Sequence, residues 1–199
     1  MVTATGVALL MVVVLGCRKG GPVADTEFLM EPDEWASHTR QSPTCGIPVL
    51  IPDTAQGTLS LSRPAGTLWL PRGTRELPTT TPDARKWMLP DSSRVDLWVT
   101  ENPAAGLATS GNVQVDLDHK CWIPVATRPA LVLQFRLIDT ARLDTTYGAT
   151  VHTLLERGLA LNLFVEAPSA AARRAALSAI SAFRLQPRPK KVSRRGYGD

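Results

Sequence analysis

Apolar and polar residues alternate along several stretches in the second half of the chain, as expected of β-strands that bury one face. The clearest stretch is Ala130–Ile138, in which Leu131, Leu133, Phe135 and Leu137 occupy every second position. The same period predicts five more strands, at Arg94–Thr100, Asn112–Leu117, Trp122–Val125, Thr150–Leu155 and Leu159–Val165.

Earlier stretches give weaker strand signals. Ile47–Ile51 is apolar but contains a proline, which predicts at best an edge strand. Thr58–Ser62 and Thr67–Leu70 flank the turn signal Arg63–Gly66 and predict a hairpin. Residues 71–92, rich in turn-forming residues, predict an irregular excursion around a tryptophan.

The period changes to that of a helix after Pro168. Residues 169–183 are rich in alanine, the best helix former, and Ser169 is a suitable N-cap. The apolar residues fall on one stripe, while Arg173 and Arg174 lie off it and are expected to face water. We therefore predict an α+β fold, in which a C-terminal α-helix packs on one face of an antiparallel β-sheet.

The order of these elements over about residues 57–185, ending in Ser181-Ala-Phe183-Arg-Leu185, resembles the Mog1/PsbP-like domains. Domains of that family are small α+β modules found in many exported and lipid-anchored proteins. The resemblance implies a binding or assembly module and carries no shared chemistry.

The N-terminus has the pattern of an export signal. Val7–Leu15 is an apolar run of nine residues, too short to span a membrane but typical of a secretory signal. The sequence Val14-Leu15-Gly16-Cys17 that ends it resembles the lipobox of bacterial lipoproteins. The resemblance implies diacylglycerol on the Cys17 thiol, cleavage before it and acylation (commonly palmitate) of the new N-terminus. The alternatives are a thiol in an ordinary signal peptide or in a buried N-terminal helix.

The chain is accordingly divided into a signal peptide (1–16), a lipidated Cys17 with a tether (17–44), one α+β domain (45–187) and a disordered basic tail (188–199). The tether is rich in Gly, Pro and charge, although Trp35 is expected to dock part of it on the domain. Arg18 stands where the lipoprotein family carries an inner-membrane retention Asp. We expect a lipid-anchored protein of the cell envelope, on the outer membrane, facing the periplasm or the cell surface.

Two cysteines remain after Cys17. In an oxidising compartment Cys45 and Cys121 are expected to form a disulfide if the fold brings them together. The alternative is a pair of separate buried thiols.

The net charge of +4 lies in the tail, because residues 188–199 carry a formal charge of +4 by themselves. A nucleic-acid-binding domain carries a basic face on its body, so this distribution argues against one. The basic tail residues could contact an anionic lipid or glycolipid surface, or could act only as a solubilising tail: Arg188, Lys190, Lys191, Arg194 and Arg195.

No catalytic or cofactor motif is present: there is no Gly-x-Ser-x-Gly, phosphate-binding loop, His-Glu-x-x-His or Cys-x-x-Cys. We therefore assign no catalytic residue and no cofactor. Asp116, Asp118 and His119 are weak candidates for metal ligands, since their spacing fits no standard site and a polar turn is the simpler interpretation.

Trp98 lies on the polar register of its predicted strand, where it could stack on a sugar, a peptide or another protein, with Trp87 and Trp122 as further ligand-binding candidates. The alternative is that Trp98 fills a second apolar layer. The sequence thus favours a non-catalytic binding or assembly module that meets the membrane through its anchor and another envelope component through its sheet. An unrecognised envelope hydrolase and a structural surface protein stay open as alternatives.

Overall fold

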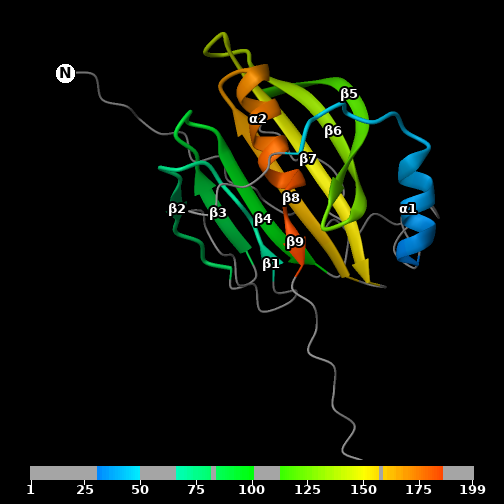
Figure 1. The fold of residues 1–199 in the computed structure, drawn as a ribbon. Helices are drawn as coiled ribbons and strands as arrows, with labels where there is room; N and C mark the ends of the chain where they lie inside the picture. The colour runs from blue at the N-terminus through cyan, green and yellow to red at the C-terminus, as the bar shows by residue number, and fades with distance from the viewer. Residues whose placement is uncertain (1–30, 50–65, 82–83, 101–112, 157–158, 186–199) are drawn as a thin grey trace, which may run out of the picture.

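The computed structural model describes residues 31–49, 66–81, 84–100, 113–156 and 159–185. Seven antiparallel strands form one sheet in the order β2-β3-β4-β8-β7-β6-β5 (Figure 1). The strands are β2 (Arg75–Leu77), β3 (Ala84–Met88), β4 (Arg94–Thr100), β5 (Val113–Val125), β6 (Arg128–Asp139), β7 (Asp144–Glu156) and β8 (Leu159–Ala167). A C-terminal helix, α2 (Ala170–Ser181), packs on this sheet, which confirms the predicted α+β class.

Helix α2 begins where the sequence predicts, since the Ser169 hydroxyl accepts a hydrogen bond from the backbone N–H of Ala172 at 3.1 Å. Its apolar stripe lies across β5, β7 and β8 and forms the main core with them. Large side chains that are fully buried in this layer include Leu97, Leu161, Leu163, Leu177 and Phe183. Each buried leucine of this size contributes about 2 kcal/mol of hydrophobic free energy, so burial on this face stabilises the fold.

The face of the sheet opposite α2, called here the second face, carries helix α1 (Pro32–Arg40) over β6 and β7. Trp35 is buried there with Leu154, Ala160 and Leu131, so α1 is docked through this side chain. The predicted tether is therefore wrong for the residues of α1, although the expected docking of Trp35 is found. The sequence signals for the helix are Pro32 in its first turn and the favourable placement of charges, with acidic residues at its start and basic residues at its end.

Strand β5 is longer than the sequence suggests. The two predicted strands on either side of Asp118 are one continuous strand with a register shift between Leu117 and His119. The predicted polar turn there is wrong because neighbouring arginines pair with the acidic side chains and allow the backbone to stay extended.

Residues 71–92, predicted to be irregular, contain strands β2 and β3. These strands pair with each other, and β3 also pairs with β4. The prediction is wrong because the flanking prolines and polar residues dominate the sequence pattern of this segment, and such residues are typical of turns. Burial of Trp87 in the main core, with 7% of its surface exposed, favours the strand instead.

The expected hairpin at Thr67–Leu70 is replaced by a long-range pair. The strand β1 (Gly66–Thr67) pairs with β9 (Arg184–Leu185) just after α2, while the other arm of the hairpin lies outside the described residues. Ile47–Val49, the described part of the predicted edge strand, is also not a strand. Its backbone is held by α2 instead, since the Gly46 carbonyl accepts from Arg174 and the Pro48 carbonyl from the Ser178 hydroxyl.

A disulfide joins Cys45 to Cys121, with an S–S distance of 2.06 Å. Beside it, the backbone N–H of Cys45 donates to the Trp122 carbonyl at 3.0 Å, and the N–H of Trp122 donates to the Pro43 carbonyl at 2.9 Å. The segment after α1 is thereby fixed along the C-terminal half of β5.

The predicted signal peptide, Cys17 and the predicted tail lie outside the described residues, as does the first part of the predicted tether. In the part of the chain that the structure describes, no helix is both long and apolar enough to cross a membrane.

Candidate functional site

A hydrogen-bonded chain of polar side chains crosses three strands on the second face. His152 on β7, Asn162 on β8 and Thr100 on β4 are neighbours in register or nearly so. His152 Nδ1 lies 2.7 Å from Asn162 Oδ1, and because an amide oxygen only accepts, the ring donates from Nδ1. Asn162 Nδ2 in turn donates to Thr100 Oγ1 at 2.9 Å. Burial lowers the pKa of His152, and the bond to Asn162 offsets this only in part, so the imidazole is held neutral.

Trp98 lies beside this polar chain, opposite Asn162 in the pairing of β4 with β8. Its ring is partly exposed and packs against a second apolar cluster that contains Phe135, Leu137 and Phe164. The alternative interpretation of Trp98, as part of a second apolar layer, therefore describes much of its surroundings. Its role in ligand binding stays a prediction.

The three tryptophans do not form one surface. Trp87 is in the main core on the face that α2 covers, and Trp98 is on the other face. Trp122 is on β5, four strands away from β4 in the sheet, a separation of about 19 Å at the usual strand spacing. Trp87 and Trp122 are therefore separate from Trp98 as ligand-binding candidates, a separation that register alone could not show because it does not reveal which strands are neighbours.

A second polar group on this face is an ion pair. Asp96, which is 4% exposed, accepts two hydrogen bonds from the Arg94 guanidinium, one of them from Nε at 2.8 Å. These bonds raise the pKa of Arg94, while burial raises the pKa of Glu166, which lies opposite Arg94 on β8. Lys86 Nζ is 3.9 Å from Asp96, so the buried carboxylate is neutralised from two strands.

The weak metal candidates occupy the exposed half of β5. Asp116 pairs with Arg136, and Asp118 pairs with Arg136 at 3.2 Å and with Arg173 at 2.9 Å. Among the described residues, no cluster of three or more His, Cys, Asp or Glu side chains could hold a metal ion. The two carboxylates instead bind guanidinium groups, which occupy the lone pairs that a cation would need.

Arg173 is a residue whose role the sequence missed. The helical stripe predicts that its side chain faces water, but only 7% of Arg173 is exposed. Its Nη1 donates to the backbone carbonyls of Phe135 at 3.0 Å and Gly148 at 3.3 Å as well as to Asp118, and its guanidinium lies 5.7 Å from the centre of the Tyr147 ring. Helical periodicity gave no signal for this burial, because the partners come from β5, β6 and β7.

The outer edge of β5 carries exposed apolar side chains. This strand ends the sheet, and the segment at Thr44 bridges it only near Trp122. In the first half of β5, Leu117 is 59% exposed and Val115 is 36% exposed. In the part of the chain that is described, no strand pairs with this half on the side away from β6. Such an edge offers backbone groups and apolar side chains to a partner strand.

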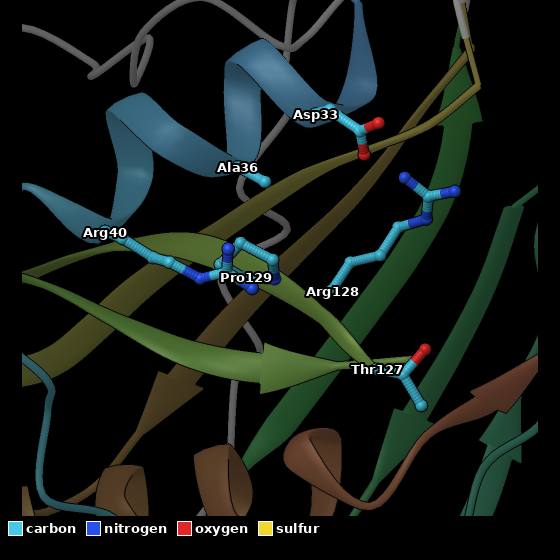
Figure 2. Close-up of a pocket in the computed structure, with 6 residues that line it drawn as sticks. All are labelled: Asp33, Ala36, Arg40, Thr127, Arg128 and Pro129. Carbon is cyan, nitrogen blue, oxygen red and sulfur yellow. The ribbon is translucent and has the colours of Figure 1, made fainter.

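A pocket of about 380 Å³ lies between α1 and the turn that joins β5 to β6. We call it the α1 pocket. Figure 2 shows its six lining residues: Asp33, Ala36 and Arg40 from the helix, and Thr127, Arg128 and Pro129 from the turn and the start of β6. Sequence analysis did not predict this pocket, because the residues of α1 were expected to form a tether. Asp33, Ala36 and Arg40 lie on one stripe only when the segment is helical.

Comparison with known proteins does not identify a family for this chain. No protein-family model matches the chain, and no curated protein matches it.

Proposed function

We propose that this chain is a lipid-anchored envelope protein whose domain is a non-catalytic assembly module, and that it associates with a second copy of itself through the free edge of β5. The observation that carries the proposal is the exposure of Leu117 and Val115 on the first half of a sheet-ending strand. The lipobox resemblance at Cys17 supports the membrane anchor.

The first half of β5 is complementary to itself. The uninterrupted part of the strand runs from Val113 to Leu117, where the register shift begins. An antiparallel pairing centred on Val115 places Val113 of each copy opposite Leu117 of the other, and Gln114 opposite Asp116. Apolar residues then meet on one face and polar ones on the other. Each pair occurs twice about the axis, as a two-fold symmetric interface requires.

The side chains on the two faces of this segment suit such a contact. Val115 and Leu117 lie opposite Leu137 and Phe135 of β6, so their face continues the apolar cluster of the second face. Asp116 is already neutralised by Arg136, so its approach to a second chain costs less than that of an unpaired carboxylate.

The expected affinity is low. Each cross-strand pair contributes about 0.2–1 kcal/mol, and five residues a side make a small interface. A lipid anchor that confines copies to one membrane raises their effective concentration, which favours a weak contact of this kind. Assembly through β5 and anchoring through Cys17 therefore support each other.

The hydrolase alternative has less support. The described groups with shifted pKa values are Arg94, His152 and Glu166, and none of them lines the α1 pocket. An active site would be expected to gather such groups in one cleft.

The test is cysteine cross-linking of the full chain in its membrane. Val115→Cys lies on the proposed two-fold axis, so mild oxidation should give a disulfide-linked dimer. Adding Leu117→Lys should reduce the dimer several-fold, because a charge would enter the apolar pairing. Leu143→Cys, at an 89% exposed position in the β6–β7 turn, measures the background of random collisions. Equal cross-linking at positions 115 and 143 would contradict the proposal.

A further inference from the structure

The α1 pocket brings together charged side chains that have no partner in the described chain. Arg40 comes from the last turn of α1 and Arg128 from the first residue of β6. Figure 2 shows Arg128 extending from its strand toward α1, on the side where Asp33 lies, and Arg40 reaching from the helix toward the start of β6. Two arginines and one aspartate thus line the same pocket.

The arginines of this pocket differ from most others in the domain. Arg85, Arg94, Arg136, Arg142 and Arg173 each form an ion pair with a carboxylate. Within the described residues, no ion pair or hydrogen bond of the side chains of Arg40 and Arg128 is found, although Arg128 is half-buried. Two arginines and one aspartate give this pocket an excess of positive charge, which attracts an anion, and the planar guanidinium fork matches the oxygens of a phosphate.

The turn between β5 and β6, which forms one wall of the α1 pocket, has a backbone conformation that is unusual for its residue types. Ala126 and Thr127 have positive φ angles of 51° and 68°, values that favour Gly or Asn, at a cost of about 1 kcal/mol each. The turn is held because the N–H of Ala126 donates to the Phe183 carbonyl at 3.0 Å. A fixed turn of this kind presets the direction in which Arg128 leaves the backbone.

We propose that the α1 pocket binds a phosphate group linked to an ammonium, the chemistry of phosphoethanolamine. In this arrangement Arg40 and Arg128 bind the phosphate oxygens, and Asp33 on the helix receives the ammonium. The acidic side chain makes the pocket select a zwitterion over a simple anion, because it repels a second negative charge and attracts the amine. The group can come from a lipid headgroup or from a soluble compound.

The lipid source is within reach of the chain. Fourteen residues separate Cys17 from the start of α1 at Pro32. They span at most about 50 Å when extended. If Cys17 carries lipid, as the proposed function holds, headgroups of the same leaflet are accessible to the pocket. Binding of the soluble compound does not depend on this.

The binding test uses the full chain in detergent, titrated with O-phosphoethanolamine and, separately, with inorganic phosphate, and followed by calorimetry. Saturable binding of phosphoethanolamine is expected, stronger than that of phosphate. Arg40→Gln and Arg128→Gln should each weaken it about tenfold, the loss of one charge-assisted contact. Asp33→Asn should remove the preference for phosphoethanolamine over phosphate.

Arg72→Gln is the matched control, since Arg72 is exposed and lies before β2 at the opposite edge of the sheet. It should change the affinity less than about twofold. Equal weakening by Arg72→Gln and Arg128→Gln, an unchanged preference in Asp33→Asn, or no saturable binding would each overturn the proposal. All four positions are exposed or half-buried, so thermal melting can verify that each variant is folded.

A competition arm separates the two sources. Phosphatidylcholine vesicles with and without phosphatidylethanolamine are added to the chain loaded with O-phosphoethanolamine. Displacement only by the vesicles that contain phosphatidylethanolamine supports a lipid headgroup as the ligand, whereas retention supports a soluble one. A dimer that forms while the pocket fails to bind would overturn this inference and leave the proposed assembly intact.

Discussion

Arg173 of α2 donates from Nη1 to Oδ2 of Asp118 on β5 at 2.9 Å, across 55 residues of sequence. The same guanidinium binds the carbonyls of Phe135 and Gly148 on the two strands that follow β5 in the sheet. One side chain therefore ties the first turn of the helix to three strands and compensates a carboxylate of the exposed β5 edge.

Removal of Arg173 should be costly. Arg173→Met removes a donor from the carbonyls of Phe135 and Gly148 and leaves Asp118 with Arg136 as its remaining partner. We expect the free energy of unfolding to fall by about 2–3 kcal/mol, because buried polar groups that lose a hydrogen bond cost about 1–3 kcal/mol each. Urea denaturation measures the change. Arg174→Met is the control, because Arg174 is exposed and should cost less than about 1 kcal/mol. Equal losses in the two variants would contradict the assigned role.

The disulfide is expected to stabilise the domain strongly. Cys45 and Cys121 are 76 residues apart in sequence, and the chain-entropy model assigns about 4 kcal/mol to a loop of that length. The double variant Cys45→Ser/Cys121→Ser should lose that amount in chemical denaturation, and reducing agent should have no further effect on it. Reactive thiols at both positions in unreduced protein would show that the bond is absent.

The neutral state of His152 predicts a pH dependence. Its pKa in the folded protein is lowered from the unfolded value of 6.5, so below pH 6.5 the unfolded state takes up a proton that the folded state resists. The contribution of the neutral His152 side chain to the free energy of unfolding is fully present above pH 6.5 and is lost as the pH falls toward the pKa of the folded state. The raised pKa of Glu166 acts in the opposite direction, since its protonated form favours the folded state.

The two effects separate by substitution. His152→Gln retains an amide donor for Asn162 but does not titrate, so its free energy of unfolding should fall less than that of the wild type between about pH 7.5 and about pH 5.5. Glu166 contributes equally to both proteins and cancels. His38→Gln, at an exposed position on α1, should behave as the wild type does. The same pH slope in all three proteins would contradict the burial of a neutral imidazole.

Docking of α1 should depend on the apolar body of Trp35. Trp35→Ala should lower the free energy of unfolding by about 3 kcal/mol and expose α1 to proteolysis. Trp35→Phe should cost clearly less, since the indole N–H is buried and has no hydrogen-bond partner in the described chain. Equal losses for Ala and Phe would mean that a partner of the N–H, rather than packing, holds the helix.

The anchor is tested at Cys17. Cys17→Ser should yield a protein that lacks the acyl mass and leaves the membrane fraction, because a lipobox without its thiol cannot accept diacylglycerol. Mass spectrometry and fractionation measure both effects. An unchanged mass and an unchanged distribution would contradict the lipid anchor.

Local sequence was sufficient where one element carries its own signal. The strand Arg94–Thr100 and the N-cap at Ser169 lie where the pattern predicts them. The alternation of small apolar and polar residues and the alanine-rich stripe are properties of neighbouring residues, so they determine the α+β class without knowledge of the partners.

The tertiary structure decided what depends on distant partners. The burial of Arg173, the merging of two predicted strands into β5 and the pairing of β1 with β9 all arise from contacts between segments far apart in sequence. The same holds for the pocket between Arg40 and Arg128, whose two walls come from elements 88 residues apart in numbering. Periodicity reports only which face of an element is apolar, whereas charge compensation, edge position and convergence of side chains depend on which elements become neighbours when the chain folds.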